Sequence, residues 1–186
     1  AVSNQYSGIT ISSAMDEIAL DGANVSSSSP ITIDGNSVSA RTAEIDGKNV
    51  QVLASGTLLA DGSRVVSAGY GTVNLTAGTV IATDSGTTST NLTGAGGVTV
   101  SATSGGLTVA GATVQSDWGS LDFVSQGDIT LNDTTISTGG QALADFATGS
   151  ATLYVDGTTI DDSDGVLEYT PAGITVIPDR SDVVAG

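Results

Sequence analysis

Four aspartates near the C-terminal end have the type and spacing that could bind a metal ion. Asp161, Asp162 and Asp164 lie close together before Gly165, and Asp156 precedes them at the end of an apolar stretch. Calcium binds clustered carboxylate oxygens, so these four aspartates form a candidate calcium site. A solvated turn explains the same cluster, because aspartate hydrogen-bonds its own backbone in turns. Neither a calcium-binding nonapeptide nor an EF-hand loop surrounds it, and we expect no other cofactor.

Two aromatic residues lie in glycine-containing segments where they could stack on a sugar. Trp118 stands in the segment Ser-Asp-Trp-Gly, and Tyr70 lies between two glycines. An aromatic ring offers a flat apolar face for such stacking. Packing in the core or at the end of the fold is the alternative for each residue.

Four asparagines stand in Asn-x-Ser/Thr sequons and could carry glycans. They are Asn24, Asn74, Asn91 and Asn132. Serine and threonine are so abundant that some of these matches arise by chance. The pattern is compatible with a glycosylated surface protein.

The chain lacks the side chains that most enzymes use. It has no histidine and no cysteine, so neither a Ser-His-Asp triad nor a Cys-His pair can form. Polysaccharide lyases need basic residues near the substrate, and the only ones available are Arg41, Lys48, Arg64 and Arg180. Polysaccharide hydrolases need clustered carboxylates, and the only dense cluster is the aspartate group above. We therefore expect a protein that is not an enzyme.

The charge is strongly unbalanced. Twenty acidic residues face four basic ones, for a formal net charge of −16. Nucleic acids and anionic membrane surfaces are therefore poor partners, because both attract lysine and arginine. No apolar run is long enough to insert in a membrane. The acidity favours solubility or adaptation to high salt, where self-repulsion is screened.

One short unit recurs along the chain. Two alternating apolar residues precede a four-residue turn that carries glycine or aspartate, and another apolar residue follows the turn. The clear copies are Ile18-x-Leu20, DGAN, Val25; Ile31-x-Ile33, DGNS, Val38; Ala43-x-Ile45, DGKN, Val50; Leu58-x-Ala60, DGSR, Val65; Val73-x-Leu75, TAGT, Val80; Leu107-x-Val109, AGAT, Val114; Ile129-x-Leu131, NDTT, Ile136; and Leu153-x-Val155, DGTT, Ile160.

The unit predicts a stack of short strands. Alternation places the apolar residues on one face of a strand, and Asp-Gly turns the chain. Copies that stack on one another bury a continuous apolar column. We predict an all-β protein, a parallel β-helix (β-solenoid) of about seven coils, each of roughly 22–30 residues, in a single domain over residues 1–186. The aspartates of the turns (Asp21, Asp34, Asp46 and Asp61) are interpreted as turn residues. A β-sandwich completed by a donor strand is the alternative fold.

Both ends differ from the middle. Residues 12–20 contain Ser13 three positions before Asp16, a helix-start pattern, and could form a short N-terminal cap. Residues 171–186 contain Pro171 and Pro178, and proline is typical of an edge strand. The tail after this strand is predicted either to reach a neighbouring molecule or to fray.

Residues 104–160 carry a family resemblance. The segments SGGLTVAGATVQS, QGDITLNDTTISTGG and SATLYVDGTTID resemble the haemagglutinin-type repeats of filamentous-haemagglutinin-like adhesins. The resemblance implies a right-handed parallel β-helix, exported to a bacterial surface and used in adhesion.

These features predict a secreted or cell-surface structural protein. An adhesin and a filament subunit that self-associates end to end are both compatible with a stack of coils, because open strand edges add further strands. Surface glycans are the other expected partner. A carbohydrate-binding or carbohydrate-processing β-helix module is the alternative function.

Overall fold

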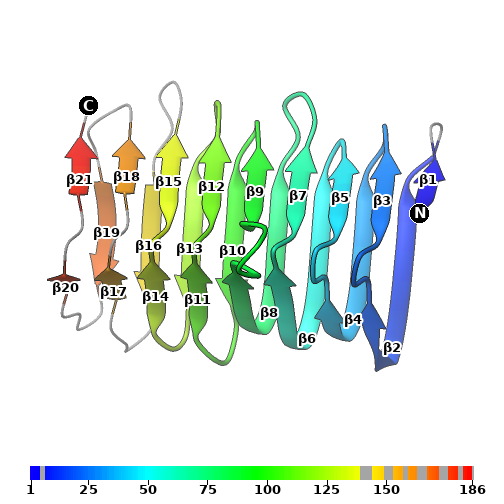
Figure 1. The fold of residues 1–186 in the computed structure, drawn as a ribbon, viewed down its shortest axis with the longest axis horizontal. Helices are drawn as coiled ribbons and strands as arrows, with labels where there is room; N and C mark the ends of the chain where they lie inside the picture. The colour runs from blue at the N-terminus through cyan, green and yellow to red at the C-terminus, as the bar shows by residue number, and fades with distance from the viewer. Residues whose placement is uncertain are drawn as a thin grey trace.

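The structure confirms the predicted parallel β-solenoid (Figure 1). It is a computed structural model that describes residues 1–4, 7–138, 144–148, 153–156, 159–162, 167–171, 176–179 and 182–185, with side chains up to residue 137. All elements in these ranges are strands, and their pairings are parallel. The β-sandwich alternative is therefore wrong, since it requires antiparallel sheets.

The strands form two sheets. The nine-stranded sheet comprises β1 (Val2–Asn4), β3 (Asn24–Ser27), β5 (Glu44–Gly47), β7 (Arg64–Ser67), β9 (Asn91–Gly94), β12 (Thr113–Ser116), β15 (Thr135–Thr138), β18 (Thr159–Asp162) and β21 (Asp182–Ala185). The twelve-stranded sheet begins with four long strands, β2 (Ile9–Ala19), β4 (Ile31–Ser39), β6 (Val50–Asp61) and β8 (Val73–Thr83). It continues as pairs of short strands, β10 (Val98–Ala102), β11 (Leu107–Ala110), β13 (Leu121–Ser125), β14 (Ile129–Asn132), β16 (Ala144–Thr148), β17 (Leu153–Asp156), β19 (Leu167–Pro171) and β20 (Val176–Asp179).

Each coil has three faces. The first halves of the long strands, with β10, β13, β16 and β19, form the first face, and the second halves, with β11, β14, β17 and β20, form the second. The nine-stranded sheet is the third face. We call the bend between the first and second faces the first corner, and the turn before the third face the second corner. The loop that leads to the next coil is the third corner.

The register gives the coil length directly. The chain returns to the same position at Ile9, Ile31, Val50, Val73, Val98, Leu121, Ala144 and Leu167. The number of coils agrees with the prediction of about seven. Ile31 pairs with Val50 and Val73 with Val98, so a coil takes between 19 and 25 residues. These lengths lie at the lower end of the predicted range, and only the coil from Ile31 to Val50 is shorter.

The repeated unit marks all three corners. The DGAN turn before Val25 is a second corner, where Gly22 has a φ of 65°. The DGNS segment before Val38 is a first corner inside β4. Gly35 meets a different constraint there, because a Cβ would lie 2.9 Å from Cδ1 of Ile18 on the preceding coil, and that side chain would have to shift. The glycine of an Asp-Gly pair therefore adopts a positive φ at the second corner, whereas at the first corner it leaves room for a side chain of the preceding coil.

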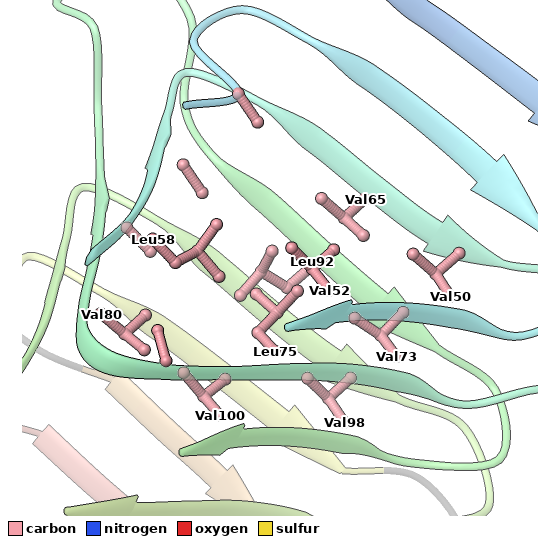
Figure 2. Close-up of a cluster of buried hydrophobic side chains, with 14 of the residues drawn as sticks. Val50, Val52, Leu58, Val65, Val73, Leu75, Val80, Leu92, Val98 and Val100 are labelled. Carbon is pink, nitrogen blue, oxygen red and sulfur yellow. The ribbon is translucent and has the colours of Figure 1, made fainter. Parts of the chain in front are cut away.

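The core is a set of straight apolar columns, each made of residues at one register position on successive coils. Val50, Val73 and Val98 form one column, and Val52, Leu75 and Val100 form the next. Figure 2 shows these side chains pointing into the space that the coil encloses. They are at most 2% exposed, so apolar contact between coils is the main stabilising interaction.

Small residues fill the second corner, and one of them predicts a stabilising substitution. Ser63 lies between Ala43 and Thr90, is fully buried, and its Oγ has no hydrogen-bond partner among the described residues. We expect Ser63→Ala to raise the free energy of unfolding by about 1 kcal/mol, because an unsatisfied buried hydroxyl is costly. Urea denaturation followed by circular dichroism measures the change.

Thr90→Ala is the matched control. The Oγ1 of Thr90 lies 2.8 Å from the Ala60 carbonyl and 2.5 Å from the Thr83 carbonyl. This variant should lose stability where Ser63→Ala gains it. Destabilisation by both variants would show that the Ser63 hydroxyl has a partner.

The predicted N-terminal helix cap is wrong. Residues 12–19 belong to β2, which pairs with β4 on both sides of a bulge between Ser13 and Glu17. The amide of Asp16 does donate to Oγ of Ser13 at 3.2 Å, the contact expected of a helix start. That contact forms within the bulge, because pairing with β4 satisfies the flanking backbone.

The C-terminal region ends in two short strands that continue the ladder. In the segment with Pro171 and Pro178, which was predicted to be an edge or terminal strand, residues 176–179 form β20 and pair with β17. Residues 182–185 form β21, which pairs in register with β18. They are therefore the last strand of the third face rather than an arm or a frayed tail.

Candidate functional site

The candidate calcium site is divided between two faces. Asp156 ends β17 on the second face, whereas Asp161 and Asp162 end β18 on the third. Asp164 lies outside the described residues. Where side chains are described, no group of three acidic or other metal-type side chains is gathered to hold an ion. Calcium at this site stays a prediction.

An acidic column was not anticipated from the sequence. Asp122, Asp145 and Glu168 occupy one register position on β13, β16 and β19. Successive rungs are about 4.8 Å apart, so the backbones of three acidic residues follow one another at this spacing. The three residues stand 23 positions apart in the sequence, so a 23-residue period is the signal that could have found them.

The aspartate of one Asp-Gly turn, Asp21, joins two adjacent coils. Its Oδ1 accepts hydrogen bonds from Oγ of Ser39 at 2.6 Å and from the amide of Arg41 at 2.9 Å, both on the next coil. Its Oδ2 lies 3.5 Å from Nη1 of Arg41. The Ser39 hydroxyl first, then the Arg41 amide and charge, hold the pKa of Asp21 below its ordinary value of 3.8.

This lowered pKa predicts an acid-sensitive contribution to stability. The ionised carboxylate stabilises the fold at neutral pH, and that contribution is lost as the pH falls through the lowered pKa. We expect Asp21→Asn to cost about 1 kcal/mol at pH 7, since the side chain is half exposed, and to cost nothing once Asp21 is protonated. Thermal unfolding from pH 7 to pH 2 measures the difference.

Asp34→Asn is the control, because Asp34 is exposed at a first corner and makes none of the Asp21 contacts. A cost for Asp21→Asn that persists unchanged in acid would contradict a role for the charge.

The described arginines are engaged in ion pairs between coils. Nη1 of Arg64 lies 3.0 Å from Oε1 of Glu44 and 3.8 Å from Oδ2 of Asp46. Arg41 pairs with Asp21, and Arg180 lies outside the described residues. Of the arginines that a lyase could use on a sugar acid, Arg41 and Arg64 therefore pair with carboxylates of this protein.

The asparagines of the four sequons all lie on strands. Asn24 and Asn132 are exposed, whereas Asn74 and Asn91 are half-buried. Oδ1 of Asn91 accepts a hydrogen bond from Oγ1 of Thr93 at 2.6 Å, and Asn74 and Thr76 repeat this pair at 2.8 Å. Two of the sequons thus form local side-chain pairs on the outer surface. Their use in glycosylation stays a prediction.

The two candidate stacking residues are both exposed. Tyr70 is 83% exposed and Trp118 is 66% exposed, so neither packs in the core. Tyr70 follows β7 and Trp118 follows β12, which places both at third corners. A shallow polar depression of about 280 Å³ lies elsewhere, on the outer side of β1 and β3, lined by Ser3, Asn4, Ser26, Ser27, Ser28 and Asp46.

Comparison with protein-family models, curated proteins and solved structures finds no match for this chain. In the part of the chain that the structure describes, no helix has the length and apolar character to cross a bilayer.

Proposed function

We propose that this protein is a non-enzymatic extracellular structural protein, either a surface adhesin or a filament subunit that stacks end to end. The observation that carries the proposal is an open strand edge at each end of the solenoid. Within the described ranges, β1 pairs with β3 alone and β2 with β4 alone. At the other end, β19, β20 and β21 each pair with one neighbour.

The N-terminal edge has free hydrogen-bonding groups and an incomplete apolar column. The amide of Ile9 donates to the Pro30 carbonyl at 3.0 Å. Donors alternate in direction along a strand, so the amide of Thr10 faces away from β4. Val2 is 50% exposed although the next member of its column, Val25, is 1% exposed. Another strand placed here would satisfy the backbone and cover the column.

A second copy can continue two faces of the solenoid. If its β2 lies beside β19 and β20 of the first copy, the first and second faces continue without a gap. In that arrangement β1 of one copy and β21 of the other fall on the same rung of the third face. Only one of these two strands can pair at that rung, so contact between two copies displaces either β1 or β21.

Charge opposes this contact at low salt. Asp16 and Glu17 lie on β2, and Glu168, Asp179 and Asp182 lie on the last strands. Like charges that meet at an interface repel one another, and salt screens the repulsion. We therefore expect assembly to increase with ionic strength.

Electron microscopy and light scattering at low and high salt test the proposal. Thr10→Pro removes the outward donor of β2 without removing a described hydrogen bond, and proline is tolerated in an edge strand. This variant should fold but fail to assemble, whereas Thr10→Val, which keeps the donor, should assemble. Monodisperse wild-type particles at high salt would overturn the filament form of the proposal.

A further inference from the structure

The two large exposed aromatic side chains lie on the same edge of the solenoid. Tyr70 is in the loop of residues 68–72 and Trp118 in the loop of residues 117–120, and the loop of residues 95–97 lies between them. These loops follow β7, β12 and β9, whose ends are neighbours along the upper edge in Figure 1. We call the three loops the aromatic corner.

Backbone hydrogen bonds stack the three loops directly on one another. The amide of Gly96 donates to the Gly71 carbonyl at 2.8 Å, and the amide of Trp118 donates to the Ala95 carbonyl at 2.9 Å. Tyr70 and Trp118 are therefore separated by one intervening loop. At the rung spacing of parallel strands, the loops that carry them lie about 9.5 Å apart along the axis of the solenoid.

The loop between the aromatic residues has almost no side chains, and the packing explains why. A Cβ on Gly96 would collide with the carbonyl oxygen of Tyr70, and a Cβ on Gly119 would collide with the carbonyl oxygen of Gly96. Ala95 carries the one side chain of residues 95–97. The loop of residues 95–97, which lies between the loops of Tyr70 and Trp118, therefore projects little beyond its backbone. We call this loop the glycine step.

Polar groups border this step on both sides. Asp117, next to Trp118, is exposed, and its Oδ1 lies 3.4 Å from Nε2 of Gln115. Lys48 and Asn49 form the third corner one coil before Tyr70 and are exposed. Carboxylate, amide and ammonium groups beside aromatic faces are the donors and acceptors that sugar hydroxyl groups need.

We propose that the aromatic corner binds a neutral oligosaccharide whose sugar rings stack on Tyr70 and Trp118. The axial spacing of the two loops is about that of alternate rings in an extended, β-linked chain, so a ligand that stacks on both residues would bridge the glycine step. A neutral ligand is favoured because the protein has a net charge of −16 and repels anionic glycans. The proposal does not depend on filament formation, and it would supply the partner of an adhesin.

Trp118 makes the proposal directly measurable, since it is the only tryptophan of the chain. A sugar that stacks on it shifts its fluorescence emission and protects it from acrylamide quenching. The probes are soluble β-linked oligomers of glucose, N-acetylglucosamine and mannose, from monosaccharide to hexasaccharide, with oligogalacturonate as the anionic comparison. We expect a saturable shift with at least one neutral series, and affinity that rises until the oligomer spans both rings.

Variants separate stacking from other effects. Tyr70→Ala should weaken binding of the long oligomer about tenfold while leaving the Trp118 signal available, and Tyr70→Phe should retain most of the affinity. Trp118→Ala, followed by calorimetry, should weaken it similarly. Met15→Ala is the control, because Met15 is 85% exposed and lies on the bulge of β2. Circular dichroism verifies that each variant is folded.

Several results would overturn the proposal. They are the absence of any fluorescence or calorimetric response to the neutral oligomers, an affinity that does not depend on oligomer length, and equal losses for Tyr70→Ala and Met15→Ala. If Tyr70→Ala and Trp118→Ala instead abolish self-association without changing oligosaccharide binding, the aromatic corner is a contact between copies and not a glycan site. If only filament assembly fails, the expected oligosaccharide-binding results do not change, because the glycan proposal does not depend on assembly.

Discussion

Phe123→Ala is expected to lower the free energy of unfolding by about 3–5 kcal/mol, because it removes a large side chain from a closed interior. Phe123 is 1% exposed and follows Val100 in its column. Phe146 and Tyr169 occupy the next register positions on β16 and β19. Urea denaturation followed by circular dichroism measures the loss.

Val124→Ala is the matched control for Phe123. Val124 is the next residue on β13, and it is 36% exposed on the outer side. Its replacement should cost less than about 1 kcal/mol. Coils contact mainly their neighbours, so Phe123→Ala is also expected to split the unfolding transition, with the C-terminal coils unfolding first. Equal costs for the two variants would contradict the inward position of Phe123.

Gly71→Ala is expected to cost about 3 kcal/mol, because the third corners stack without room for a side chain. A Cβ on Gly71 would overlap the carbonyl oxygen of Lys48 on the preceding coil. The backbone itself must move to relieve this overlap, and the hydrogen bond from Gly96 to Gly71 moves with it. Thermal unfolding and the exposure of Trp118 to acrylamide both report the change.

Gly69→Ala distinguishes crowding from backbone strain within the same loop. Gly69 has a φ of 66°, and a Cβ added to it would meet no other atom within 4 Å. Alanine there should cost about 1 kcal/mol, the strain of a left-handed conformation. If Gly69→Ala were as costly as Gly71→Ala, conformational freedom and not the stacking of loops would explain both glycines.

Much of the architecture follows from local pattern. The repeated unit predicts that residues such as Leu20, Val25 and Leu75 face inward, and they are buried. Alternation determines this, because successive side chains of a strand point to opposite sides. The turn that includes Asp21 and Gly22 was also predictable, since few residues other than glycine accept a positive φ.

The placement of equivalent segments depended on the stacked coils. The units that end in Val25 and Val38 look alike in sequence, yet one forms a second corner and the other a first corner. Ser13 makes a helix-start contact inside a strand, because the pairing of β2 with β4 outweighs the local preference. Each outcome is determined by which backbone groups the adjacent coil satisfies.

The candidate glycan site was also predictable from the sequence only in part. Residue type and flanking glycines identify Trp118 and Tyr70 as stacking candidates, but not their common edge or their separation. Their common edge and their separation follow from the register of β7, β9 and β12. This register places two residues that are far apart in the sequence on loops two coils apart. Amino-acid alternation determines which side of a strand a residue faces, whereas the hydrogen bonds between coils determine which residue lies beside it.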